Sequence, residues 1–333
     1  MSQLVDAYGR PITYMRVSIT DRCNLRCVYC MPAEGIELKR HSDMLSVEEF
    51  ARVIKVASGM GIQRVRITGG EPLAHRGVVK LVQAVAALPE ISDVSMTTNA
   101  TLLAPVAEEL AQAGLRRINI SLDSLRADTY AVLTRCGDLA AATAGLHAAE
   151  RAGLAPIRIN CVVLRGINSD EIEAMAALTV EHPWDVRFIE FMPFWGNGGQ
   201  FGAEHVMPVD EIRRRVLGMG ARASAEANAS AGEAGPASYL KLPGAAGRVG
   251  FISRDGDEFC GACNRIRLTA DGMFRPCLLS DSMIDVKTAL RSGADDEAIA
   301  GLVRAAVAAK PESGRSRGAD GRWHAVPLSE IGG

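Results

Sequence analysis

Short strand-like segments alternate with helix-like segments over the first 190 or so residues, and this alternation constrains the fold more than any other feature of the chain. Six stretches are rich in β-branched or apolar residues: 13–19, 64–68, 93–98, 117–122, 157–164 and 186–192. Helical spacing marks the segments between them, at about 46–60, 76–88, 103–113, 126–152 and 169–181. Two of these segments carry helix-start signals: Ser46 with Glu49 three residues later, and Asn168-Ser169-Asp170. Six β-α units are too few to close an eight-stranded barrel. We therefore predict an α/β fold, a partial, open (β/α)6 TIM-type barrel whose strand C-terminal ends carry the site.

A change in composition divides the rest of the chain. Residues 221–238 (ARASAEANASAGEAGPAS) are almost wholly small or polar and cannot bury a core. After them, 247–253 and 265–278 have the character of strands, and the second of these predicts a hairpin that turns at 271–272. We predict a partial barrel over 1–220, a low-complexity linker or loop over 221–240, and a smaller C-terminal domain over 241–333.

Charge and hydropathy narrow the classes of function. The formal net charge is -2, from 37 basic and 39 acidic residues, which argues against a general electrostatic grip on nucleic acid or an anionic membrane. No apolar run approaches the ~20 residues needed to span a bilayer, and MSQLVDAYGRP lacks the regions of a signal peptide. We therefore expect a cytoplasmic protein with no nucleic-acid or membrane partner.

Six of the eight cysteines fall into two groups of three. The first has Cys-x3-Cys-x2-Cys spacing directly after the first predicted strand, and the second has Cys-x2-Cys-x13-Cys spacing in the C-terminal part. Thiolates suit iron–sulfur clusters, and three ligands for four irons leave one iron open for chemistry. The alternative is zinc with a fourth ligand, such as His41 for the first group. The members are Cys23, Cys27 and Cys30, then Cys260, Cys263 and Cys277; Cys136 and Cys161 are expected to be ordinary, partly buried residues.

Two motifs together resemble the radical S-adenosylmethionine superfamily: the first cysteine group, with aromatic Tyr29 before its last cysteine, and ITGGEPL at 67–73. The glycines of the second motif let the backbone approach a ligand closely, and Glu71 offers an anion to a ligand ammonium group, although such a tetrapeptide can also be a simple turn. The resemblance implies a [4Fe-4S] cluster that cleaves S-adenosylmethionine into a 5′-deoxyadenosyl radical. It implies cofactor contacts at Tyr29, Gly70, Glu71, Ser121 and Met192; core packing is the alternative for Met192.

The C-terminal stretch FCGACNRIRLTADGMFRPCL is closely similar to the GTP 3′,8-cyclase family of molybdenum cofactor biosynthesis. The resemblance runs from about Tyr14 to Arg275 and resumes at the terminal IGG. It implies conversion of GTP to (8S)-3′,8-cyclo-7,8-dihydroguanosine 5′-triphosphate, in which the radical removes the 3′ hydrogen and the sugar radical attacks C8. A second [4Fe-4S] cluster would hold the guanine base.

Arginines accompany these motifs, and guanidinium groups suit phosphates. Residues two apart in a strand face the same side, so Arg265 and Arg267 can point together; the alternative is that both are solvated. The resemblance implies GTP contacts at Arg16, Arg66, Thr97, Arg158, Arg265, Ile266 and Arg267. The chain departs from the family at Arg158 and Arg64, where lysine is usual or common, and at Leu328 in the tail. By resemblance Gly332 and Gly333 enter the active site, whereas simple fraying is the alternative.

Other interpretations remain open. A different radical enzyme with an auxiliary cluster, such as a peptide-modifying maturase, would share the first motifs. A non-enzymatic electron-transfer or zinc-stapled protein would need neither the glycines nor the arginines. No GxxxxGK[ST] motif exists, so P-loop nucleotide hydrolysis is not supported. The family suggests as partners an electron donor such as a flavodoxin, the next pathway enzyme, cyclic pyranopterin monophosphate synthase, and a second copy of the chain in a homodimer.

Overall fold

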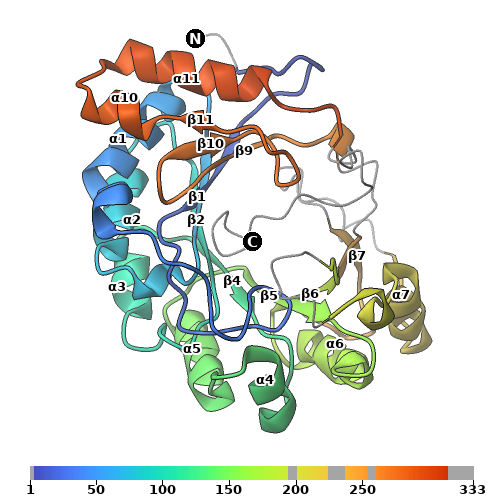
Figure 1. Cartoon of the computed structure of the whole chain (residues 1–333). Helices are drawn as coiled ribbons and strands as arrows, with labels where there is room; N and C mark the ends of the chain where they lie inside the picture. The colour runs from blue at the N-terminus through green and yellow to red at the C-terminus, as the bar shows by residue number, and fades with distance from the viewer. Residues whose placement is uncertain (1–3, 194–200, 224–236, 254–259, 314–333) are drawn as a thin grey trace.

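The chain forms an open, curved α/β sheet with its helices on the outside. The computed structural model describes residues 4–193, 201–223, 237–253 and 260–313. Most of the predicted linker and the C-terminal diglycine lie outside the described residues. The six predicted barrel strands are present as β1 (Tyr14–Ser18), β2 (Arg64–Thr68), β3 (Asp93–Thr98), β4 (Arg117–Ser121), β5 (Ile157–Val163) and β6 (Asp185–Glu190). Each pairs in parallel with the next, which confirms the predicted open (β/α)6 barrel (Figure 1).

Helices cover the outer face of this sheet, where Figure 1 shows them following its curve from one edge to the other. They are α1 (Val47–Gly59), α2 (Val78–Ala86), α3 (Ala107–Gln112), α4 (Ala127–Thr134), α5 (Leu139–Arg151), α6 (Ile172–Glu181) and α7 (Val209–Gly218). Alternate strand residues such as Val17, Ile67 and Phe188 are buried against them. The residues between these point to the inner face, where polar side chains line a cavity.

The C-terminal strands extend both edges of the same sheet. They are β7 (Ser238–Leu240), β8 (Val249–Ile252), β9 (Arg265–Leu268), β10 (Met273–Arg275) and β11 (Ile284–Asp285). The described strands lie in the order β11-β10-β9-β1-β2-β3-β4-β5-β6-β8-β7. The predicted hairpin is confirmed, since β9 and β10 are antiparallel and Gly272 between them has a φ of +79°. The domain limits at 220 and 240 stay a prediction.

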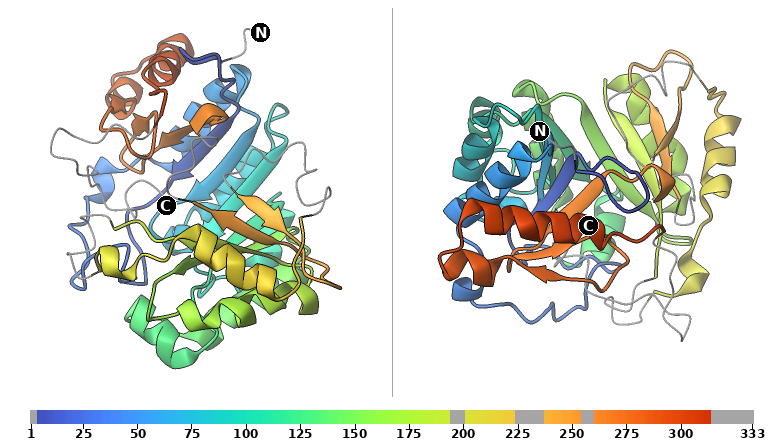
Figure 2. Two further views of the ribbon diagram at one scale, coloured as in Figure 1. Left: turned by 90° about the vertical axis from the view of Figure 1, so that its right-hand side faces the viewer. Right: turned by 90° about the horizontal axis from the view of Figure 1, so that it is seen from above.

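The C-terminal helices return the chain to the start of the barrel. They are α10 (Lys287–Arg291) and α11 (Asp296–Ala308). Figure 2 shows α11 beside α1, where Arg52 pairs with Asp296 at 2.9 Å. Among the described residues, no helix has the length and apolar character that a membrane span requires.

Two helix predictions differ from the structure. The segment 126–152 is two helices, because Arg135 takes a φ of +63° that ends α4. Asn168 was expected to start a helix, but a 3-10 turn over Ser169–Glu171 precedes α6 and the Asn168 side chain caps neither. Its amide donates instead to the carbonyls of Asp123 and Val162, since these bonds satisfy buried backbone groups beneath the strand ends. The predicted start of α1 is confirmed, because Ser46 and Glu49 form a capping box.

Gly145 permits α5 to pack directly on the loop after β3. A Cβ atom at Gly145 would lie 2.1 Å from the carbonyl oxygen of Ala100, whereas one at Gly301 in α11 would meet no atom within 4 Å. We expect Gly145→Ala to lower the free energy of unfolding by about 1–3 kcal/mol through overpacking. Gly301→Ala, the matched control, should raise it by about 0.5–1 kcal/mol. Anaerobic urea unfolding followed by circular dichroism measures both, and equal stabilisation by the two changes would contradict the packing described.

Candidate active site between two cysteine groups

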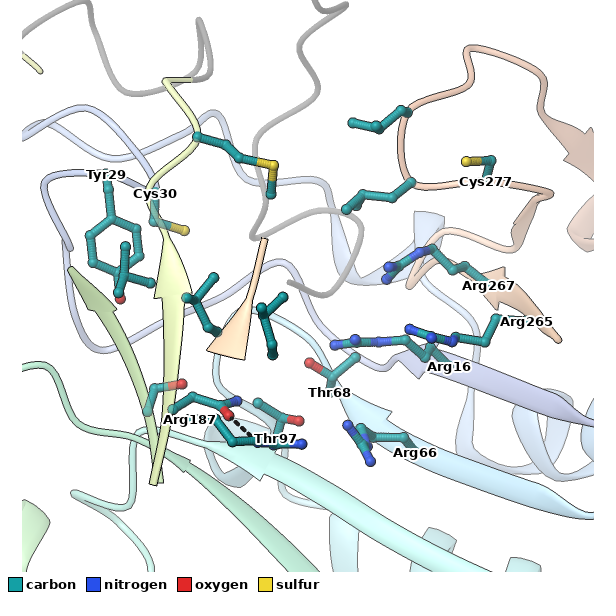
Figure 3. Close-up of a pocket in the computed structure, with 18 of the residues that line it drawn as sticks. Arg16, Tyr29, Cys30, Arg66, Thr68, Thr97, Arg187, Arg265, Arg267 and Cys277 are labelled. Carbon is teal, nitrogen blue, oxygen red and sulfur yellow. Dashed lines mark hydrogen bonds between the residues drawn. The ribbon is translucent and has the colours of Figure 1, made fainter. Parts of the chain in front are cut away.

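A cavity of about 390 Å³ opens at the C-terminal ends of the barrel strands and brings the two cysteine groups to one space. All six of the predicted metal-ligand cysteines line it. In Figure 3, Tyr29 and Cys30 stand on one side and Cys277 and Arg267 on the other, with Arg16 and Arg66 among the side chains of the wall. The chain thus places side chains from residues about 250 apart in sequence around a single pocket.

The first cysteine group lies on a loop that the end of α4 holds in place. Backbone bonds join Arg26 N to the Thr134 carbonyl at 3.1 Å and Val28 N to the Leu133 carbonyl at 2.9 Å. The Arg135 guanidinium then donates to the carbonyls of Arg26 and Met31, each at 2.9 Å. Arg135 itself ends α4 with a φ of +63°. Sequence reasoning missed Arg135, because a non-glycine residue carries no local signal for a positive φ.

The glycines of the second motif serve the cysteine loop. Gly70 N donates to the Thr20 carbonyl at 2.7 Å, and Glu71 N donates to the Arg22 carbonyl at 2.8 Å. A Cβ atom at Gly70 would lie 2.3 Å from the Arg22 carbonyl oxygen. We expected these glycines to leave room for a ligand beside the backbone. In the structure, the backbone of the cysteine loop occupies the space beside Gly70.

Glu71 is buried and fixed by three donors. Its carboxylate accepts hydrogen bonds from the Thr98 hydroxyl at 2.6 Å, from Asn99 N at 2.8 Å and from Leu73 N at 3.0 Å. Burial raises the pKa of Glu71 to about 7, although these three bonds oppose the rise. The carboxylate thus ties the strand end of the glycine motif to the end of β3, and it also lines the cavity.

Tyr29 is held by a carboxylate that the sequence did not single out. Its hydroxyl donates to Asp123 Oδ2 at 2.7 Å, while Val162 N donates to Asp123 Oδ1 at 2.8 Å. Burial raises the pKa of Asp123 to about 6, against the effect of both bonds. Ser121 and Met192, expected near the cofactor, line the same cavity. Asp123 therefore links the cysteine loop to β5.

Four arginines line the cavity between the two cysteine groups and form what we call the arginine wall: Arg16, Arg66, Arg265 and Arg267. Arg16 on β1 is in register with Arg66 on β2 and with Arg267 on β9. Burial, and then the charge of Arg267, hold the pKa of Arg16 well below its usual value. Burial and then Arg265 likewise lower the pKa of Arg267 to about 10. Like charges buried this closely favour an anion that would offset them.

Arg187 on β6 lies on the inner face of the sheet, which forms the floor of the cavity. Its guanidinium donates to Asn160 Oδ1 at 2.9 Å and to Asn119 Oδ1 at 2.7 Å, so its orientation is fixed. Figure 3 shows it beside Thr97, which also lines the cavity. Burial lowers the pKa of Arg187 to about 10, with the charge of Arg158 adding to the effect.

Two of the residues implied for GTP do not line the cavity. Arg158 lies beneath the floor, with its Nε 3.6 Å from Asp185 Oδ2, and Asp185 also pairs with Arg248 at 2.7 Å. The side chain of Ile266 is fully buried in the core. This follows from strand alternation, because its neighbours Arg265 and Arg267 both face the cavity.

The second cysteine group has a basic neighbour that sequence reasoning also missed. Lys310 Nζ donates to Cys263 Sγ at 3.3 Å. Burial raises the pKa of Cys263, but Lys310 and then Arg265 outweigh burial, so the net shift is downward. Burial instead raises the pKa of Cys23 to about 11. A lysine after a helix carries no sequence signal for such a contact, because α11 packs there only in the folded chain.

The donor sets fit iron–sulfur clusters. Each group offers three thiols to the same cavity, and N–H groups already point at sulfur: Leu25 N lies 3.4 Å from Cys23 Sγ, and Lys310 bonds to Cys263. Within the described part of the chain, no three His, Cys, Asp or Glu side chains gather round a single metal ion. Cluster cysteines bind different irons, so their sulfurs need not converge on one point.

Comparison with known proteins agrees with this geometry. Residues 17–179 match the Radical SAM superfamily and residues 184–315 match Molybdenum Cofactor Synthesis C. Streptococcus suis SuiB bound to S-adenosylmethionine has the same fold, with a TM-score of 0.58 and 17% identity over 88% of this chain and 68% of SuiB. SuiB bound to its precursor peptide SuiA gives a TM-score of 0.60 at 16% identity, over 89% and 68% of the two chains. Fold and site define a radical S-adenosylmethionine enzyme, a class that carries a [4Fe-4S] cluster and S-adenosylmethionine.

Full-length relatives give the family. The chain is 45% identical to the GTP 3′,8-cyclase of Pelotomaculum thermopropionicum, over 98% of this chain and 99% of the relative. It is also 45% identical to that of Heliobacterium modesticaldum, over 99% and 100%. The chain belongs to the GTP 3′,8-cyclase family, which confirms the resemblance found in its motifs.

The close approach at Gly70 makes a testable prediction. We expect Gly70→Ala to displace the Arg22 carbonyl and distort the cysteine loop, so that the chain binds less iron and no longer cleaves S-adenosylmethionine. Gly59→Ala at the end of α1 is the control, since a Cβ atom there would meet nothing within 4 Å. Iron analysis and chromatography of 5′-deoxyadenosine after anaerobic reconstitution measure the outcome. Full iron with normal cleavage in Gly70→Ala would show that the loop does not need this glycine.

Proposed function

We propose that this enzyme converts GTP to (8S)-3′,8-cyclo-7,8-dihydroguanosine 5′-triphosphate, the first step of molybdenum cofactor biosynthesis. The observation that carries the proposal is the arginine wall between two cysteine groups in one cavity. A triphosphate offers the multiple negative charges that such a wall requires. The names of the full-length relatives support GTP as the nucleotide.

The first cysteine group would hold the cluster that activates S-adenosylmethionine. When bound, that cluster supplies the electron that cleaves the cofactor and releases the radical that takes the 3′ hydrogen of GTP. The Glu71 carboxylate and the Gly70 carbonyl would accept from the ammonium group of the cofactor's amino acid part, close to the cysteine loop to which both residues donate their N–H groups. Tyr29, fixed by Asp123, would close one side, and Ser121 at the end of β4 and Met192 just after β6 line the same cavity.

The arginine wall would bind the triphosphate. Arg16, Arg66, Arg265 and Arg267 line the cavity and would neutralise phosphate charge, with Thr97 as a neutral donor. Arg158 would act from beneath, where its charge already bears on Arg66 and Arg187. Ile266 would contribute through its backbone, because its side chain is buried.

The second cysteine group would hold a second [4Fe-4S] cluster whose open iron binds the guanine base. It faces the first group across the cavity, as a substrate held between two clusters requires.

We further propose an electron donor such as a flavodoxin, transfer of the product to cyclic pyranopterin monophosphate synthase, a cytoplasmic location, and a homodimer. The domain limits 1–220, 221–240 and 241–333 are proposed as given by composition.

The experiment that tests this function is anaerobic incubation with dithionite, S-adenosylmethionine and each nucleoside triphosphate in turn, followed by mass analysis. GTP should give a product of unchanged mass but altered chromatography, together with 5′-deoxyadenosine. ATP, CTP and UTP should give no cyclised product. Equal turnover of all four nucleotides, or cleavage of the cofactor with no change in GTP, would contradict the proposal.

Arg265 and Arg267 give a prediction on binding. We expect Arg265→Ala and Arg267→Ala each to weaken GTP binding about ten- to a hundredfold, because each removes one charge-assisted contact. Arg304→Ala is the control, since Arg304 is an exposed residue of α11 paired with Glu297. Anaerobic calorimetry measures the affinities. Unchanged affinity in both cavity variants would remove these arginines from the site.

The diglycine tail gives a prediction that separates binding from chemistry. The described chain ends at Ser313, which lines the cavity, and the following residues are enough to reach its interior at up to ~3.3 Å each. Deletion of Gly332 and Gly333 should therefore leave iron content and GTP affinity nearly intact and greatly reduce cyclised product, because a thin backbone can enter a filled site. Product formation at the full-length rate would show that the tail is inert.

A further inference from the structure

Lys310 lies at the second cysteine group with its side chain buried. The residue is 4% exposed and lines the cavity just after α11. Its ammonium group donates three hydrogen bonds: to Cys263 Sγ at 3.3 Å, to the Arg265 carbonyl at 2.8 Å and to the Pro276 carbonyl at 3.1 Å. These acceptors belong to both stretches that carry the second group, since Pro276 precedes Cys277. One cation thus joins the two halves of the proposed cluster site.

The charge of Lys310 requires a negative partner. Burying an ammonium group is costly unless hydrogen bonds and an opposite charge compensate it. Its three protons are all used, but two of the acceptors are neutral carbonyls. Among the described residues, no carboxylate lies within ion-pair distance of Lys310. The sulfur of Cys263 is therefore the partner that can carry the charge, and as a cluster ligand it would do so as a thiolate.

Arg10 holds the chain next to Lys310 from the other side. Its guanidinium donates to the Cys260 carbonyl at 2.7 Å, the Glu312 carbonyl at 2.8 Å and the Pro311 carbonyl at 2.6 Å. Asp6 Oδ2 fixes the Arg10 Nε at 2.6 Å. The backbone on each side of the Lys310 contact is therefore pinned, and the ammonium group has little freedom to leave the sulfur.

We propose that Lys310 is a positioning residue for the second cluster, whose ammonium group offsets the thiolate charge of Cys263 and makes the cluster easier to reduce. The inference rests on the proposed second cluster. Hydrogen bonds and positive charge at ligand sulfurs stabilise the reduced, more negative form of a cluster and so raise its reduction potential. The same residue begins the segment that leads to the tail, so it fixes that segment at the cluster.

The test compares Lys310→Met, which keeps the length and removes the charge, with Lys310→Arg, which keeps the charge. Lys80→Met on α2 is the control, because Lys80 is exposed, pairs with Glu48 and is not among the residues that line the cavity. Each full-length protein is reconstituted anaerobically, and its clusters are titrated with reductant and followed by electron paramagnetic resonance. The signal that is lost in Cys263→Ala is assigned to the second cluster.

We expect Lys310→Met to shift the midpoint potential of the second cluster to a more negative value and leave that of the first cluster unchanged. Lys310→Arg should restore most of the potential. Loss of the second signal in Lys310→Met with retention in Lys310→Arg also supports the proposal, since the charge would then be needed for assembly. An unchanged potential in Lys310→Met, or equal loss of the cluster in both variants, would overturn it.

Failure of the underlying function is distinguishable. The proposed function predicts about eight iron atoms per unmodified chain, from two four-iron clusters. About four iron atoms, with no signal that depends on Cys263, would reject the second cluster itself. About eight iron atoms with no effect of Lys310→Met would reject only the role of Lys310.

Discussion

The pairing of β9 with β1 is the contact on which the site depends. It brings residue 267 beside residue 16, although about 250 residues of chain separate them. Through this pairing the second cysteine group comes to face the first across one cavity, and Arg265 and Arg267 join the arginines of the first two strands. Strand β9 therefore completes the active-site wall by extending the barrel sheet beyond β1.

That arrangement brings several positive charges together in the buried cavity. These charges are compensated in two different ways. Beneath the floor, Asp185 lies between Arg158 and Arg248 and offsets one of their two positive charges. In the wall, burial and like charges depress the pKa of Arg16 and Arg267, so a polyanionic substrate would relieve a stored electrostatic cost. Lys310 is a further buried positive charge, at the second cysteine group, and its partner there is the sulfur of Cys263.

The sequence predicted the local features well, because period-two alternation and cysteine spacing are local signals. The six barrel strands followed from this alternation, the capping box from Ser46 with Glu49 three residues later, and the hairpin turn from Asp271 and Gly272. Asn168 resembled a helix cap, yet its amide serves buried carbonyls in three-dimensional contact. Arg135 and Lys310 could not be predicted, since one depends on a rare backbone conformation and the other on packing between distant segments. The glycines of ITGGEPL were recognised, but their contact with the cysteine loop was not.

The central claim is that the two cysteine groups enclose GTP so that a radical from S-adenosylmethionine reaches its ribose. Transfer of deuterium tests this most directly. The enzyme is incubated anaerobically with GTP deuterated at the 3′ carbon. The 5′-deoxyadenosine and the nucleotide product are then isolated, and their masses are measured by mass spectrometry. The account predicts one deuterium in 5′-deoxyadenosine and its loss from the nucleotide product. Unlabelled 5′-deoxyadenosine formed alongside cyclised product that still holds the deuterium would contradict it.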